Sequence, residues 1–251
     1  MTPRQAIPKS NQKFFRAFLL RNSPLPLAPS SLSSENCPML TDPLPRKPRL
    51  LAEFLRSDQL AELELPPDNR LNIRAAAIES AIKDGKRAVV GQACADFLAA
   101  AAAFYNVQPP GVRALAARPL RVRESGWSSE LFGDYTFETM LIRIWTRTAV
   151  RKQITSGGTF LSTLCHEFCH HLDCQRLGFR HSPHTRGFYE RAAALYHHAR
   201  GTPVKRLCWV RMPRGRWRID WSRMNRPAPR VSLEQSRPGG IFNLPARLPG
   251  E

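Results

Sequence analysis

Residues 166–170 read His-Glu-Phe-Cys-His, an HExxH sequence inside an apolar stretch. Positions i and i+4 of an α-helix share one face, so this spacing places two histidines side by side. His166 and His170 can then hold one metal ion, with Glu167 beside its open side, as in zinc hydrolases. The pattern predicts a Zn²⁺ site with Glu167 as catalytic base; the alternative is two surface histidines on an amphipathic helix.

A third protein ligand is expected, because catalytic zinc is normally held by three side chains and a water molecule. The longer HExxHxxGxxH pattern is excluded, since Asp173 and Arg176 occupy its last two defining positions. The favoured third ligand is His184, in a loop just before the next expected helix. Glu190 on that helix is the alternative third ligand, and His181 in the same loop is a further candidate.

Other polar residues near the motif have more ordinary expected roles. His171 points about 100° away from His170 around the helix, so it is expected to pack or to hydrogen-bond. Asp173 can accept a hydrogen bond that orients a histidine, or it can be a plain surface acid. Tyr189 and Tyr196 could assist at the reacting carbonyl, although core packing is the commoner role of such residues.

The elements that would position these residues follow an α+β order. Thr159 is the expected N-cap of the HExxH helix, and Gly178 is its expected C-cap. A further helix is predicted at 186–199. Apolar periodicity and strand-forming residue types place the remaining elements as helices at 50–65, 71–83 and 86–105 and strands at 119–123 and 135–148.

Proline is concentrated at the two ends of the chain, with nine residues before position 50 and seven after 202. This distribution predicts three segments. They are a disordered N-terminal segment at 1–48, one ordered domain at 50–202 (a helical part at 50–117, then strands and metal-site helices at 118–202), and a basic Trp- and Arg-rich tail at 203–251. The tail is expected to be partly disordered, with a short hairpin around 213–215.

The formal net charge is +18, of which +6 lies in residues 1–50 and +8 in residues 203–251. Such a balance indicates either a solvated basic surface or attraction to nucleic acid. The chain has no run of 18 apolar residues, so no membrane partner is expected. The N-terminal apolar stretch is interrupted by Arg16 and is a poor signal peptide.

The cysteines are not spaced as a disulfide framework, since Cys165, Cys169 and Cys174 fall on or beside one expected helix. A reducing, cytoplasmic location is therefore predicted. Either Met1 or Met39 could be the true start. Oligomeric state and physiological substrate stay open.

The sequence HEFCH followed by HTRGF resembles the SprT-like branch of the zincin metallopeptidases, in which an aromatic residue follows the later histidine by four positions. Here that aromatic is Phe188, and the resemblance covers residues 120–200. It implies a minimal zincin-like domain, with zinc held by His166, His170 and His184. It also implies peptide-bond hydrolysis and, in several branches, association with DNA. The family's C-terminal zinc ribbon is missing, because Cys208 stands alone.

Two functions are consistent with these features. The first is a zinc metalloprotease that hydrolyses a protein or peptide substrate through water activated by Glu167. The alternative is a nucleic-acid-binding protein with a structural or vestigial zinc site, in which the basic tail contacts phosphates and its tryptophans stack on bases.

Overall fold

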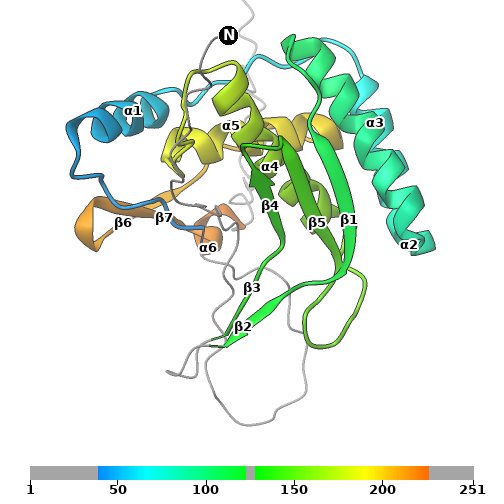
Figure 1. Ribbon diagram of the computed structural model, residues 1–251. Helices are drawn as coiled ribbons and strands as arrows, with labels where there is room; N and C mark the ends of the chain where they lie inside the picture. The colour runs from blue at the N-terminus through cyan, green and yellow to red at the C-terminus, as the bar shows by residue number, and fades with distance from the viewer. Residues whose placement is uncertain (1–38, 123–127, 226–251) are drawn as a thin grey trace, which may run out of the picture.

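The computed structural model describes residues 39–122 and 128–225, and these residues form a mixed α+β fold (Figure 1). The predicted disorder of residues 1–38 and 226–251 lies outside the described residues. In chain order the elements are α1 (Pro48–Gln59), α2 (Arg70–Asp84), α3 (Arg87–Tyr105), β1 (Gly111–Ala117), β2 (Leu120–Val122), β3 (Ser128–Glu130), β4 (Gly133–Thr136), β5 (Leu141–Arg147), α4 (Gly157–Gln175), α5 (Arg186–Arg200), β6 (Trp209–Met212), the 3-10 turn η1 (Pro213–Gly215), β7 (Arg216–Ile219) and α6 (Trp221–Met224).

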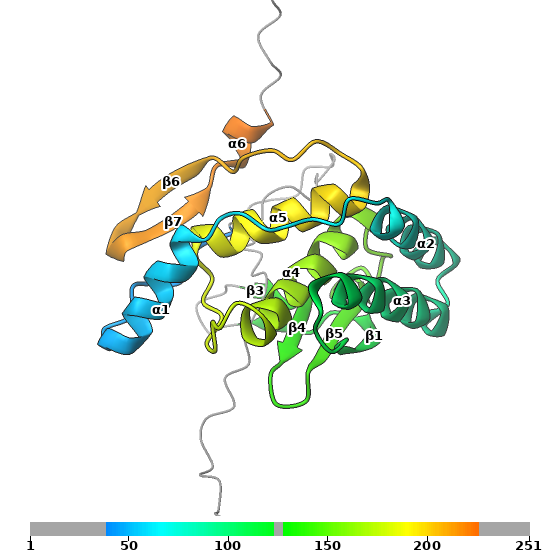
Figure 2. The same cartoon turned by 90° about the horizontal axis from the view of Figure 1, so that it is seen from above.

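A three-stranded sheet supports the HExxH helix. Its strand order is β1–β5–β4, with β1 parallel and β4 antiparallel to β5. Helices α3 and α4 pack against it, and Ile142 and Ile144 of β5 are fully buried. Figure 2 shows α4 lying between this sheet and α5. The HExxH helix is therefore enclosed on two sides, which explains its high apolar content.

Helix α3 forms a large part of the core. Cys94, Phe97 and Leu98 are fully buried and belong to the cluster that joins α2, α3, α4, α5 and the sheet. Among the described helices, α3 is the one that is long and apolar enough, by length and composition, to cross a membrane. Its packing against α2 and β1 accounts for that apolar composition within the fold.

Several expectations about local structure were wrong. Helix α1 ends at Gln59 rather than at residue 65, and the C-cap of α4 is Arg176, two residues before Gly178. The first strand begins at Gly111 rather than after residue 117, because pairing with β5 overrides the weak strand tendency of its alanines. The expected strand at 135–148 is divided into β4 and β5 by a turn that ends at Met140, whose φ is 48°. The N-cap of α4 is Ser156, whose Oγ accepts a hydrogen bond from Thr159 N at 3.2 Å.

The last part of the N-terminal segment is ordered rather than disordered. Residues 39–42 lie along β7, where Thr41 N donates to Trp217 O at 2.9 Å and Ile219 N donates to Met39 O at 3.1 Å. The hairpin predicted around Pro213–Gly215 is present as β6–η1–β7. Backbone pairing between two distant segments stabilises both of them, and composition alone does not reveal such pairing.

Candidate metal centre

His166 and His170 lie one turn apart on α4, and both rings are buried, with exposed fractions of 2% and 0%. Burial lowers the pKa of each imidazole well below 6.5, and the neighbouring His184 lowers both further. Buried imidazoles resist protonation because the charged form loses its hydration. Both histidines are therefore neutral near pH 7, which is the form that binds metals.

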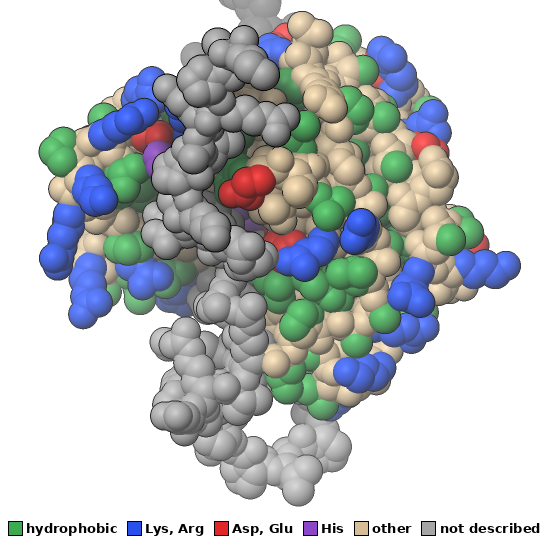
Figure 3. Space-filling view, in the orientation of Figure 1, with side chains coloured by type: hydrophobic (Ala, Val, Ile, Leu, Met, Phe, Trp, Pro, Cys, Tyr) green, Lys and Arg blue, Asp and Glu red, His purple; other side chains and the backbone are tan. Residues whose placement is uncertain are grey.

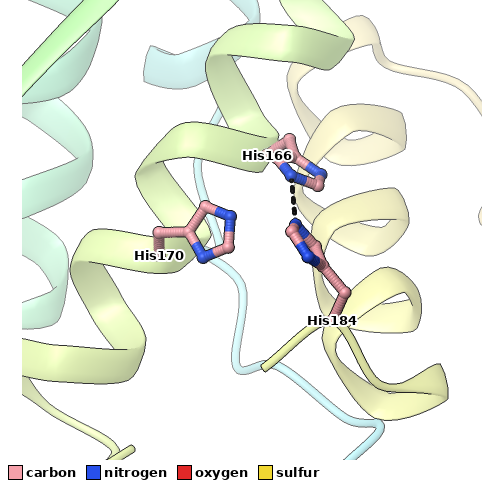
Figure 4. Close-up of side chains that lie close together, drawn as sticks. All are labelled: His166, His170 and His184. Carbon is pink, nitrogen blue, oxygen red and sulfur yellow. Dashed lines mark hydrogen bonds between the residues drawn. The ribbon is translucent and has the colours of Figure 1, made fainter. Parts of the chain in front are cut away.

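His184 completes a group of three histidines from the loop between α4 and α5. Its Nε2 lies 3.1 Å from His166 Nε2, and the three rings turn toward a common space (Figure 4). One nitrogen from each of the three residues lies within 4.8 Å of the other two. A tetrahedral ion with Zn–N bonds of about 2.0–2.1 Å keeps its nitrogens about 3.3 Å apart, so the group fits such an ion after a small contraction.

Phe188 holds the three rings in place. Its own ring is fully buried, stacks on His170 with centroids 4.5 Å apart, and meets His166 and His184 edge-to-face at 4.9 and 5.2 Å. Phe188 lies four residues after His184, near the start of α5. The aromatic position of the sequence pattern thus has a packing role, which is to restrict the orientation of all three imidazoles.

A buried polar chain fixes the orientation of His170. His170 Nδ1 lies 2.7 Å from Ser182 Oγ, and Ser182 Oγ donates to Asp173 Oδ2 at 2.8 Å. The other Asp173 oxygen accepts from Arg191 at 2.8 Å, and both members of this ion pair are buried. With Nδ1 engaged in this chain, Nε2 is the atom that His170 would present to a metal. Asp173 thus orients His170, but it does so indirectly, through the hydroxyl of Ser182. The sequence pattern identified Asp173 as a candidate for this role and did not identify Ser182.

Asp42 positions the third histidine from the opposite end of the chain. Its carboxylate accepts a hydrogen bond from His184 N at 3.0 Å and lies 3.7 Å from His184 Nδ1. Burial would raise the pKa of Asp42, but hydrogen bonding and charge from His184 outweigh burial and lower it. Sequence reasoning missed Asp42 because it assigned residues 1–48 to disorder. An acidic residue in a proline-rich segment carries no local signal of a contact 142 positions away.

Glu167 lies on the side of α4 that faces β4. Its side chain is fully buried, and within the described part of the chain neither carboxylate oxygen has a hydrogen-bond partner. Burial raises its pKa well above 4.5, and the negative charge of Asp134 raises it further. Gly133 of β4 leaves room for this carboxyl, because a Cβ there would lie 3.0 Å from Glu167 Oε1 and 2.7 Å from a Thr163 methyl carbon.

The other candidate ligands lie elsewhere. Glu190 accepts hydrogen bonds from Leu207 N and from Trp209 Nε1, at 3.3 and 3.1 Å, so it holds the chain that leads into β6 against α5. His181 bonds to Glu53 through its Nδ1 at 2.8 Å.

Three further residues have structural contacts. His171 lies 2.9 Å from Tyr135 OH through Nδ1 and 2.8 Å from Gln108 O through Nε2, as expected of a packing residue. Tyr189 is buried against His184 and donates to Leu40 O at 3.2 Å. The remaining tyrosine candidate, Tyr196, accepts from Arg200 at 3.4 Å. Both tyrosine hydroxyls therefore take part in structural contacts, and the ring of Tyr189 also lies beside His166 and His184.

The site therefore combines three buried imidazoles, of which His166 and His170 are neutral near pH 7, with the buried carboxyl of Glu167, the residue after His166 on α4. This donor set suits a borderline metal such as zinc and leaves a coordination position for water. Comparisons with models of known protein families, with curated protein sequences and with solved structures found no match for the chain. The assignment of function therefore rests on the residues and geometry of the site itself.

Proposed function

We propose that the protein is a zinc-dependent metallopeptidase with a minimal zincin-like domain of the SprT-like type. His166, His170 and His184 would hold the metal, and Glu167 would act as general base. The observation that carries this proposal is Glu167 itself. A fully buried carboxyl without a hydrogen bond among the described residues destabilises a folded protein, so its presence beside three histidines favours a chemical role.

The residues divide the chemistry among themselves. Bound zinc would polarise a peptide carbonyl and acidify a water molecule. Glu167 would accept a proton from the attacking water and deliver it to the leaving amine. Burial raises the pKa of Glu167, which makes its carboxylate a stronger base for accepting the proton of the water. Ser182 and Asp173 would keep His170 in the required tautomer, and Asp42 would keep His184 in place.

Strand β4 is the element best placed to bind an extended peptide. Strand β5, which makes up most of the strand expected at 135–148, is the central strand of the sheet and is paired on both sides. The edge next to the HExxH helix is β4, which packs on α4 and carries Gly133 beside Glu167. A substrate strand added to β4 would gain backbone hydrogen bonds and would lie near the base.

Metal analysis and peptide hydrolysis together test the proposal. We expect one zinc per chain in the wild type and in the Glu167→Gln variant, with hydrolysis of an unfolded protein substrate lost only in the variant. His184→Ala should lose zinc. Glu190→Ala is the matched control, because Glu190 lies near the start of α5, just after the loop of His184, yet bonds to the chain that leads into the hairpin, so the zinc content of this variant should be unchanged.

Two outcomes would contradict the proposal. A folded wild type that takes up no zinc would remove its basis. Zinc retention by His184→Ala together with loss in Glu190→Ala would show that the third ligand is misassigned.

Nucleic-acid binding is the second candidate function, and the β6–β7 hairpin favours it through exposed Arg211, Arg214 and Arg218. Its tryptophans are less available than the sequence suggested. Trp209 bonds to Glu190, and the Arg186 guanidinium lies 4.7 Å from the ring centre of Trp217. DNA retention at low salt that is lost on replacing these hairpin arginines with glutamine, while zinc content is unchanged, would support this function.

A further inference from the structure

Aromatic side chains surround the three histidines, and one of them carries a hydroxyl group. Two of these side chains, Phe137 and Phe188, are apolar. The third is Tyr189, whose ring centroid lies 5.7 Å from that of His184 and 5.9 Å from that of His166. Of the three aromatic rings that the structure describes here, this one can therefore donate a hydrogen bond through its hydroxyl.

The Tyr189 hydroxyl is held by a long hydrogen bond. It donates to the carbonyl oxygen of Leu40 at 3.2 Å, whereas O–H···O bonds in proteins are usually about 2.5–3.0 Å long. The acceptor is fixed by its neighbours, because Thr41 N donates to β7 at 2.9 Å and Asp42 N donates to His184 O at 2.8 Å. The hydroxyl thus has a weak resting bond to a fixed acceptor, and it can exchange that bond for a stronger one at little cost.

The surroundings of this hydroxyl are largely shielded from solvent. Tyr189 is 7% exposed and the three histidines are at most 6% exposed. Little histidine surface is visible among the described side chains on the face drawn in Figure 3. Electrostatic interactions are stronger in such a site because the effective dielectric constant is low, and a hydrogen bond to a charged acceptor is roughly twice as strong as one to a neutral acceptor. An oxygen that becomes negatively charged beside this ring would therefore compete successfully with the neutral carbonyl of Leu40.

Peptide hydrolysis needs a donor of this kind. Under the proposed function, water adds to the carbon of the scissile carbonyl, its proton passes to Glu167, and an electron pair of the C=O bond moves onto the carbonyl oxygen. Hydrogen-bond donors aimed at that oxygen stabilise its new negative charge. The other polar groups described above have different partners or roles, since Glu167 is the base and His170 Nδ1 is engaged with Ser182.

We propose that Tyr189 donates a hydrogen bond to the scissile carbonyl oxygen as it becomes negatively charged, and that the Leu40 carbonyl is its resting acceptor. This inference rests on the proposed function and adds a catalytic residue to it. The hydroxyl keeps its own proton throughout. It leaves Leu40 O, donates to the anionic oxygen until the C–N bond breaks and the carbonyl re-forms, and then returns. A long bond in the resting protein is consistent with this role, because catalytic hydrogen bonds often form fully only when substrate is bound.

Steady-state hydrolysis by zinc-loaded Tyr189→Phe tests this role, because phenylalanine keeps the ring beside the histidines and removes only the hydroxyl. We expect kcat to fall by about 10²–10³-fold, as for other single donors of this kind, while KM and zinc content stay close to those of the wild type. Tyr196→Phe is the matched control. It makes the same change further along α5, where the hydroxyl contacts Arg200, and its kcat should equal that of the wild type.

Carbon-13 NMR gives a readout that does not depend on turnover. The chain has four tyrosines, so labelling the ring carbon that bears the hydroxyl gives few signals, and Tyr189→Phe assigns one of them. A phosphonamidate peptide carries an anionic oxygen in place of the scissile carbonyl oxygen. Adding it should shift the Tyr189 signal and leave the Tyr196 signal in place. It should also bind Tyr189→Phe more weakly than the wild type, by about the factor lost from kcat/KM.

The role of Tyr189 and the proposed function can fail separately in these experiments. A Tyr189→Phe variant with the kcat of the wild type, or a Tyr189 signal that the phosphonamidate does not shift, would overturn the role of Tyr189 and leave the proposed function standing. Loss of zinc from Tyr189→Phe would also overturn it, because the hydroxyl would then support the metal ligands instead of the reaction. A zinc-loaded wild type that hydrolyses no peptide would overturn the proposed function, and this inference with it.

Discussion

Replacing Glu167 with methionine should stabilise the metal-free protein while removing any hydrolytic activity. The Glu167 carboxyl is fully buried and has no hydrogen-bond partner among the described residues, and such a group costs about 1–3 kcal/mol. Methionine has a similar length and an apolar, adaptable side chain, so it removes the penalty without leaving a void. The free energy of unfolding should rise by about 1–3 kcal/mol, which raises the Tm of a domain of this size by about 2–12 °C.

The gain from Glu167→Met should depend on pH in a defined direction. The pKa of Glu167 is raised in the folded state by burial and by Asp134, relative to 4.5 for the unfolded chain. Below pH 4.5 Glu167 is protonated in both the folded and the unfolded chain, and the wild type has its highest stability with respect to this group. That stability is lost as the pH rises through the folded-state pKa, because only the unfolded chain gives up its proton readily. The difference between the methionine variant and the wild type should therefore be smallest below pH 4.5 and should increase as the pH rises.

Urea and thermal unfolding in a chelating buffer measure these differences. Glu167→Gln is a useful comparison, because it keeps a buried polar group and should gain less stability than Glu167→Met. Glu138→Met, at an exposed acid in the β4–β5 turn, controls for the general effect of removing a charge and should change stability by at most about 0.5 kcal/mol. A metal-free methionine variant no more stable than the wild type would refute the argument that Glu167 is held at an energetic cost.

Three further variants test other contacts. Ser182→Ala should weaken zinc affinity by about 10–100-fold, because it removes the hydroxyl that links His170 to Asp173. Competition with a chromogenic chelator measures this affinity, and an unchanged value would show that the link plays no part in metal binding. Gly187→Ala should lower the free energy of unfolding by about 1–3 kcal/mol, because a Cβ there would collide with the carbonyl oxygen of Ser57. Gly91→Ala in α3 is the control and should not lower it, because a Cβ there would lie 4.0 Å from the nearest atom, Ala114 Cβ. Equal effects of the two substitutions would contradict the close approach at Gly187. Arg191→Met should lower the free energy of unfolding, measured in urea, by about 3–5 kcal/mol, because it leaves the Asp173 carboxylate buried without its cation. A decrease below about 1 kcal/mol would mean that Asp173 is protonated or solvated.

The parts of the molecule that were predictable are those with local patterns. The helix of His166 and His170 and the following helix each carry an apolar periodicity that sequence alone reveals, and the α+β class follows from the order of the elements. The grouping of His184 with the first two histidines was also anticipated, because a loop before an adjacent helix is a short route back to the same helix face.

The parts that were missed depend on contacts between distant segments. Strand β1 is alanine-rich, and it is defined by parallel pairing with β5 rather than by strand-forming residues. Asp42 lies in a segment whose composition is typical of disorder, yet it bonds to His184. Gly187 allows α5 to approach the carbonyl oxygens at the end of α1. The sequence shows a glycine at this position but does not show the segment that packs against it.

Three carboxylates from the first ordered part of the chain hold the loop of the third histidine. Glu53 bonds to His181, Asp42 to His184 and Asp58 to Arg186. Zinc held by His184 would therefore stabilise these contacts by linkage, and loss of the contacts would weaken zinc binding by the same free energy. The two α4 histidines need only a helix, whereas the third needs α1 and the segment before it to be docked. Metal binding and docking of residues 39–59 are therefore expected to be one cooperative event, in which zinc protects the amides of α1 from exchange although it touches none of them.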